Sequence, residues 1–135
     1  MTSSAHSSFV QYETLNLDAL AQWEIGDQPL TIVGDDMRGE ELAFGFLNGL
    51  ARLSNGRLIV ATDETTILTF ESAGNFLARI ARKGSGPGEF TTLTALHRIR
   101  GDTLLAYQHF PESVTLFGPD GSYVRTHRVV RSAAQ

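Results

Sequence analysis

Short apolar runs alternate with small turn-forming residues along the chain from Leu47 onward. Val, Ile, Leu, Thr and Phe dominate the runs, and the turns between them hold Asn-Gly, Asp-Glu and Ala-Gly-Asn. Apolar runs separated by such turns are typical of the strands of an antiparallel meander. The first four predicted strands are Leu47–Leu53, Arg57–Thr62, Thr66–Phe70 and Phe76–Ile80.

The same pattern is then repeated. Leu96 lies 46 residues after Leu50, and Phe117 lies 47 residues after Phe70, so the second copy holds one extra residue between its second and third strands. Four strands in a unit of this length predict one blade of a β-propeller. The strands of the second copy are Leu93–Ile99, Thr103–Tyr107, Ser113–Phe117 and Ser122–Thr126.

The second predicted strand favours a propeller over a sandwich. Leu58–Ala61 is apolar at every position, as expected of a strand that is buried on both faces. Blades stacked face against face impose that condition. Upstream, Phe44 precedes Phe90 by 46 residues, and Leu30–Val33 then fits an outer strand. The predicted fold is therefore all-β: a β-propeller fragment of two four-stranded antiparallel blades plus the outer strand of a preceding blade.

Composition and turn signals set the boundaries of these units. The first residues are Ser-rich and terminal, which predicts disorder. Phe9–Ile25 fits either a short helix or an irregular strand. The predicted segments are a disordered tail at 1–8, an N-terminal segment at 9–28, an outer strand with its connector at 29–46, blade 1 with a Gly-rich connector at 47–92, blade 2 at 93–130 and a tail at 131–135.

Charge and composition narrow the classes of partner. The 11 basic residues are scattered and the net charge is −4, so binding to nucleic acid is not expected. There are no cysteines, which excludes disulfides and cysteine metal sites. No apolar run approaches the roughly 20 residues that cross a bilayer, and the N-terminus carries no apolar signal region. We expect no membrane insertion and no signal peptide, and the compartment is left open.

Several stretches resemble the NHL-like six-bladed β-propellers. They are Leu53–Ala61, Ile67–Phe70, Gly74–Ile80 and, most specifically, the Gly-rich segment Gly84–Phe90. The resemblance implies a six-bladed ring in a longer protein, often exported and frequently without an assigned biochemical role. It predicts that this chain is part of a longer propeller.

This sequence departs from the family pattern at one position. NHL repeats usually carry an Asp after the second strand. Here Thr62 and Gln108 stand at that place, with Asp63 one position later. The role of the family's Asp is therefore not transferred to this chain.

The Gly-rich segment invites two interpretations. Beside Arg82 and Lys83, its backbone N–H groups could cradle a phosphate. A phosphate loop, however, opens a helix and ends in Lys-Ser/Thr, whereas this segment contains a proline and leads into a strand. We interpret it as a structural connector between blades, made of Gly84, Gly86, Pro87, Gly88, Glu89 and Phe90.

No catalytic, metal-binding or cofactor-binding residues are predicted. His6, His97, His109 and His127 share no metal-ligand spacing, and no serine stands in a Gly-x-Ser-x-Gly context. An acidic group before blade 1 offers oxygen ligands for Ca²⁺ without the spacing of an EF-hand, and a solvated connector is the preferred interpretation. It consists of Asp35, Asp36, Glu40 and Glu41.

The resulting hypothesis is a non-enzymatic binding or scaffolding module that binds a protein or a second copy of itself. The alternative is part of a metal-dependent lactonase or hydrolase of the six-bladed type. The predicted contact turns contain Asp63, Glu64, His109 and Glu112. An open pair of blades exposes two apolar faces. A longer chain, a ring of three copies or the segment Phe9–Ile25 would each cover them.

Overall fold

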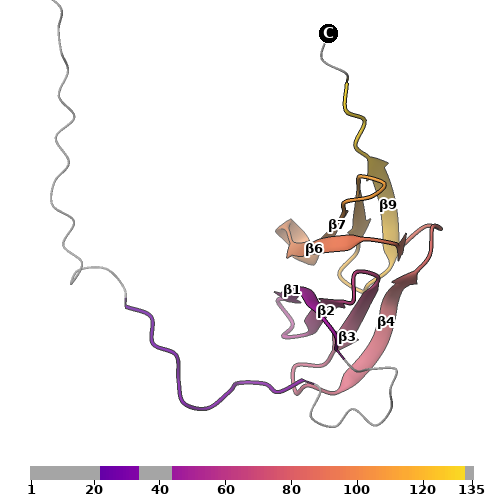
Figure 1. Cartoon of the computed structure of the whole chain (residues 1–135). Helices are drawn as coiled ribbons and strands as arrows, with labels where there is room; N and C mark the ends of the chain where they lie inside the picture. Colours follow the sequence, from indigo (N-terminus) through magenta and orange to yellow (C-terminus); the bar gives the residue numbers. More distant parts are fainter. Residues whose placement is uncertain (1–21, 34–43, 133–135) are drawn as a thin grey trace, which may run out of the picture.

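A computed structural model describes residues 22–33 and 44–132 as a pair of β-sheets with extended ends (Figure 1). The first sheet contains β1 (Leu47–Arg52), β2 (Leu58–Thr62), β3 (Thr66–Phe70), β4 (Phe76–Lys83) and β5 (Glu89–Phe90). The second sheet contains β6 (Leu93–Arg98), β7 (Leu104–Gln108), β8 (Ser113–Phe117) and β9 (Tyr123–Arg128). A single 3-10 turn, Arg100–Asp102, links β6 to β7. The predicted all-β fold is confirmed.

Each sheet is one blade. β1 to β4 pair in sequence order with antiparallel ladders, and β6 to β9 do the same. Blade 1 also contains the short strand β5, which the sequence analysis did not predict. β5 pairs in parallel with the end of β4 because the Gly-rich connector turns back and lays Glu89 beside Arg82.

The two ladders repeat in detail. A bulge interrupts the β1–β2 ladder between Leu47 and Gly49, and a bulge interrupts the β6–β7 ladder at the equivalent residues Leu93 and Ala95. The extra residue of the second copy lies in the turn between β7 and β8. The strands on either side of this turn therefore pair as β2 and β3 do in blade 1. This agreement defines which residues of the two blades are structurally equivalent.

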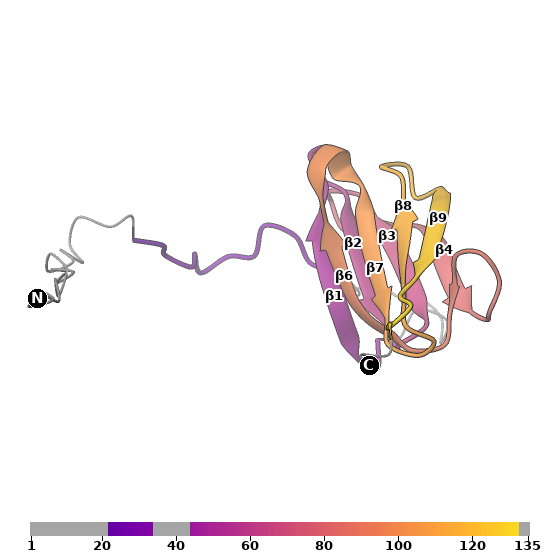
Figure 2. The ribbon, with the colours of Figure 1, turned by 90° about the horizontal axis from the view of Figure 1, so that it is seen from above.

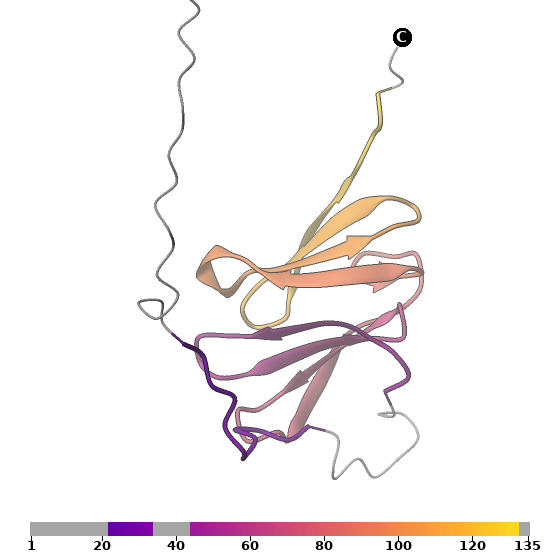
Figure 3. The ribbon, with the colours of Figure 1, turned by 60° about the vertical axis from the view of Figure 1, so that its left-hand side comes forward.

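The blades stack face to face (Figures 2 and 3), with the innermost strands β1 and β6 as neighbours. We call the face of blade 1 that contacts blade 2 the front face, and the opposite face the rear face. The structurally equivalent faces of blade 2 take the same names. The rear face of blade 2 therefore contacts the front face of blade 1. A Cβ on Gly49 would lie 2.8 Å from Cβ of Leu96, so only glycine permits this approach of β1 to β6. The core between the blades is formed by Ala51, Leu53, Ile59, Ala61, Ile67, Ala81, Phe90, Leu93, Leu96, Leu104, Ala106 and Phe117.

A second, smaller cluster lies on the rear face of blade 1. Val60, Leu68 and Phe70 are buried there, and Val33 and Phe44 pack against them. β2 and β3 are consequently buried on both faces, as the apolar sequence of Leu58–Ala61 predicts.

Leu30–Val33, predicted to be an outer strand, lies beside this rear face but forms no strand. The Thr31 hydroxyl donates to the carbonyl of Ser72 (2.9 Å), and Val33 joins the rear cluster. The segment is extended and suitably placed, but a strand needs a neighbouring backbone to pair with. No ladder reaches it within the described residues.

The described part of the N-terminal segment covers neither apolar face. Trp23 and Ile25 are almost fully exposed, and the segment runs away from the blades (Figure 1). The predicted tail at 1–8, most of the segment at 9–28 and the acidic residues Asp35, Asp36, Glu40 and Glu41 lie outside the described residues.

Candidate functional site

The Gly-rich segment joins the two blades. The Gly84 N–H donates to the carbonyl of Phe90 (3.0 Å), which closes the loop, and Phe90 is buried in the core between the blades. The Glu89 carboxylate accepts hydrogen bonds from Gly86 N and from Arg82 Nε, both at 3.0 Å. These bonds hold the pKa of Glu89 below its usual value, the Gly86 N–H contributing most. The loop's own carboxylate thus occupies an N–H group that a phosphate would need.

The turn between β2 and β3 fastens both connectors of blade 1. Asp63 and Glu64 adopt left-handed backbone conformations, with φ of 53° and 59°. The Asp63 carboxylate accepts from the N–H of Phe46 (3.0 Å), and the carbonyl of Glu64 accepts from the N–H of Leu93 (2.5 Å). Asp63 and Glu64 are two of the four residues predicted to make partner contacts. Both already hold the chain where it enters and leaves the blade.

Gln108 performs the equivalent task in blade 2. Its side-chain carbonyl accepts from the N–H groups of Thr91 (2.7 Å) and Thr92 (3.4 Å), and its amide donates to the carbonyl of Pro111 (3.2 Å). The N–H of the predicted contact residue His109 donates to the carbonyl of Thr92 (3.2 Å), as Asp63 N–H does to Phe46. In the sequence Gln108 stands out only as a departure from the family pattern, although its place at the end of the second strand was the available signal of this role.

Glu112, the fourth predicted contact residue, belongs to a cluster of polar side chains beside the front face of blade 2. Its carboxylate accepts from Arg131 Nε (2.8 Å) and from the hydroxyl of Tyr107 (3.0 Å). Arg131, and then Tyr107, lower the pKa of Glu112, and the same carboxylate raises the pKa of the Tyr107 phenol. Both partners were absent from the predicted site.

A further polar joint, which was not predicted from the sequence, links the β1–β2 turn of blade 1 to the β6–β7 turn of blade 2. The Asp102 carboxylate accepts from the Ser54 N–H (3.1 Å) and from the Ser54 hydroxyl, and it pairs with Arg98 Nε (3.0 Å). The Ser54 hydroxyl contributes most to lowering the pKa of Asp102. Since Ser54 and Asp102 belong to different blades, no short-range motif announces the contact.

The front face of blade 2 is open. Its central side chains, Leu105, Val114 and Leu116, are only half-buried. The equivalents of the first two in blade 1, Ile59 and Ile67, are 2% and 0% exposed because blade 2 covers them. An uncovered apolar sheet face marks a candidate binding surface.

The two front faces also differ in chemistry. Directly opposite residues of a ladder share a face. Ala51 and Ala81 pair with Ile59 and Ile67, whereas His97 and His127 pair with the equivalent Leu105 and Val114. Two buried alanines of blade 1 are therefore replaced by imidazoles in blade 2.

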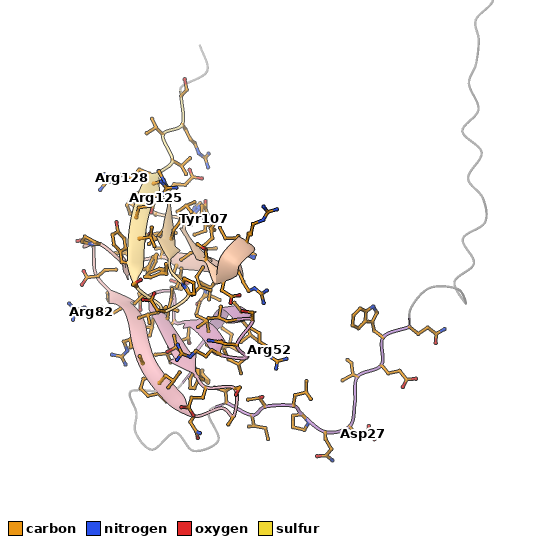
Figure 4. The ribbon with its side chains drawn as sticks, turned by 180° about the vertical axis from the view of Figure 1, so that it is seen from behind. Asp27, Arg52, Arg82, Tyr107, Arg125 and Arg128 are labelled. Carbon is orange, nitrogen blue, oxygen red and sulfur yellow. The ribbon has the colours of Figure 1, made fainter. Side chains whose placement is uncertain are left out.

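Larger polar side chains also occupy two further positions of this face. Tyr107 stands at the place of the fully buried Ala61, and Arg125 pairs with Leu116 as Ala78 pairs with Thr69. Figure 4 labels Arg125 and Tyr107 on blade 2. The front face of blade 2 consists of His97, Leu105, Tyr107, Val114, Leu116, Arg125 and His127.

No metal centre is formed by the described residues. In residues 22–33 and 44–132, no three His, Cys, Asp or Glu side chains come together as ligands. His97 and His127 lie on the front face of blade 2, and His109 lies in the β7–β8 turn. Within the same ranges no helix is long and apolar enough to span a membrane.

Two four-stranded meanders, stacked face to face through a buried connector phenylalanine, define this protein as a β-propeller. Residues 47–131, more than half of the chain, match the family described as 6-bladed β-propeller. The chain belongs to that family. The match supports a six-bladed propeller domain and does not single out its NHL-like members. No curated protein matches the chain.

Proposed function

We propose that this chain is a non-enzymatic binding module whose recognition surface is the front face of blade 2. One observation carries the proposal: Leu105 and Val114 are half-buried where the equivalent Ile59 and Ile67 are covered. Covering an apolar face of this kind is the main favourable term in protein association. Glu112, held by Tyr107 and Arg131, adds a fixed polar group at its border.

The partner we infer is another propeller blade with small residues and acidic groups at its edge. Blade 2 packs closely on blade 1 because Gly49, Ala61 and Ala81 leave room. On the front face of blade 2, the equivalents of Ala61 and Ala81 are the larger Tyr107 and His127, so less space is left for a partner. Arg125, which makes no ion pair among the described residues, favours a carboxylate opposite it.

Blade 1 of a second copy fits this surface poorly. Its rear face carries Val60 and Leu68, where the rear face of blade 2 carries the smaller Ala106 and Thr115. Both sides of such an interface would therefore be larger than in the observed one, and overpacking is costly. Val33 also packs on that rear face.

Site-specific photo-cross-linking tests both the surface and the partner. A photoreactive residue at Leu105 is expected to capture, from a lysate of the source organism, a polypeptide with a propeller-blade sequence. The same residue at Arg57, exposed on the β1–β2 hairpin, serves as the control and should capture nothing comparable.

The outcomes separate the possibilities. No adduct at Leu105, or equal adducts at Leu105 and Arg57, would refute the surface. An adduct of twice 14.7 kDa, formed by the purified chain alone, would show self-association and overturn our choice of partner. Light scattering on the same sample gives an independent mass.

A further inference from the structure

A small polar cavity lies between the Gly-rich connector and the rear face of blade 2, away from the front face. Its volume is about 100 Å³, and its lining includes Ser113, Thr115, Thr126, Arg128 and Glu89. Ser113 and Thr115 are buried in the described structure, although both are polar. Buried polar side chains are costly unless they are hydrogen-bonded, and each buried side-chain nitrogen or oxygen of the described residues has at least one partner.

The hydroxyl groups of the cavity lining use only part of their hydrogen-bonding capacity within the protein. The hydroxyls of Thr115 and Thr126 lie 2.9 Å apart, and only one of the two O–H groups can donate within the pair. The Ser113 hydroxyl oxygen accepts from the Gln108 amide (3.5 Å), which leaves its own hydrogen available. Two hydroxyl hydrogens therefore have no acceptor among the described residues.

The charge at the cavity favours an anion. Arg128 pairs with Ser113 across the β8–β9 ladder and forms no ion pair within residues 22–33 and 44–132. Figure 4 shows it on β9 with Arg125. Glu89 also lines the cavity, but its carboxylate is bound by Arg82 and by the Gly86 N–H. The guanidinium of Arg128 is the uncompensated charge.

The polar lining is particular to blade 2. In blade 1 the equivalent of Thr115 is Leu68, which is 1% exposed and belongs to the apolar rear cluster. Leu68 pairs with Val60 in the β2–β3 ladder, so an aliphatic side chain at this position leaves the ladder of a blade intact. The hydroxyl of Thr115 is therefore not needed to build a blade.

We propose that this cavity binds one small oxyanion, with Arg128, Ser113 and the Thr115–Thr126 pair as donors. A volume of about 100 Å³ holds roughly three water molecules at about 30 Å³ each, and so has room for a carboxylate or phosphate group. Charge-assisted hydrogen bonds from a guanidinium and hydroxyls are the usual means of holding such groups. This inference is independent of the function proposed for the front face.

The test is a titration of the full chain with sodium phosphate and, separately, sodium acetate at constant ionic strength, followed by amide NMR shifts. We expect saturable shifts centred on Ser113, Thr115 and Thr126. Arg128→Gln should weaken binding about tenfold, the effect of losing one charge-assisted hydrogen bond. Thr115→Val, which keeps the shape and removes the hydroxyl, should weaken binding less.

Arg125→Gln is the matched control, because it removes the same charge from the same strand on the opposite face. It should leave binding unchanged. Equal weakening by Arg125→Gln and Arg128→Gln would overturn the site in favour of non-specific attraction. Linear, unsaturated shifts with both anions would show that the cavity holds water only, and this also overturns the proposal. A preference for phosphate or for acetate distinguishes the two oxyanion classes.

Discussion

Blade 1 and blade 2 arise from the same repeat but meet different surroundings. Blade 1 is covered on its front face by blade 2 and partly on its rear face by Val33 and Phe44, and its strands β2 and β3 are buried on both sides. Blade 2 is covered on one side, and β7 and β8 alternate between buried and half-buried residues. The difference teaches that burial in this fold is set by what packs on each face of a blade and not by the strands themselves.

The inner strands give the sharpest form of this comparison. Leu93 on β6 is 0% exposed, whereas its equivalent Leu47 on β1 is 67% exposed. Leu96 and Leu50 differ in the same way, at 3% and 66%. The same leucine in the same ladder is therefore a core residue in one blade and a surface residue in the other.

The largest expected effect on stability comes from truncating one member of the equivalent pair Leu93 and Leu47. Leu93→Ala should lower the free energy of unfolding by about 2–5 kcal/mol, since it leaves a cavity between the blades. Leu47→Ala should change it by less than about 0.5 kcal/mol, as is usual at exposed positions. Urea unfolding followed by circular dichroism measures both, because the lone tryptophan, Trp23, is exposed and reports little on the core. Equal losses would mean that Leu47 is covered in solution.

Exchanging residues between the two front faces should have the next largest effect. Ala61→Tyr places the blade 2 residue into the closed joint, where it should cost about 1–3 kcal/mol or more through overpacking. The reverse change, Tyr107→Ala, removes a half-buried ring and its bond to Glu112, and we expect a smaller loss. Urea midpoints of the two variants test this order.

A third variant separates the effect of added volume at position 61 from the effect of the tyrosine hydroxyl. Ala61→Val adds volume without a hydroxyl and should fall between the native chain and Ala61→Tyr. If Ala61→Tyr is tolerated as well as Tyr107→Ala, the joint between the blades has room to spare. The size argument against a second copy on the front face of blade 2 would then fail.

The architecture was predictable because its signals are local and repeated. The bounds of β3 and β8 agree with the predicted Thr66–Phe70 and Ser113–Phe117, and the inserted residue falls in a turn where it disturbs no ladder. Leu30–Val33 was predicted as a strand from its apolar pattern and from the 46-residue spacing between Phe44 and Phe90. Pattern gives the tendency to extend, but a ladder needs a partner backbone that this part of the structure does not provide.

The site was much less predictable. The stacking of the sheets decides which alternate residues of β7 face blade 1. The replacement of Ala61 by Tyr107 at equivalent positions can therefore be interpreted only when the ladder pairing is known. The pairing of Ser54 with Asp102 spans 48 residues and two blades, and no short motif encodes it. Contacts between blades are long-range: the apolar pattern of Leu58–Ala61 predicts burial on both faces but does not identify the residues of the other blade that the strand contacts.

The smallest expected effect on stability concerns the hydrogen bonds between Asp102 and Ser54. Blade 1 has Gly56 at the position equivalent to Asp102, so the contact exists only where the two blades meet. The folded-state pKa of Asp102 is depressed below its ordinary value of 3.8, mainly by the Ser54 hydroxyl. A depressed carboxyl pKa contributes stability above the unfolded-state value, and this stability is lost as pH falls through the folded-state value.

Asp102→Asn should therefore lower the urea midpoint near neutral pH, and its difference from the native chain should shrink as pH falls from about 4 toward the depressed value. Measuring midpoints from pH 7 downward reveals this convergence. Glu24→Gln, at an exposed position outside the blades, should parallel the native chain throughout. A gap between the native chain and Asp102→Asn that stays constant with pH would show that the carboxylate charge adds nothing to the joint. The apolar core, which includes Phe90, and the hydrogen bond from Arg98 to the carbonyl of Arg52 would then hold the two blades without help from the charge of Asp102.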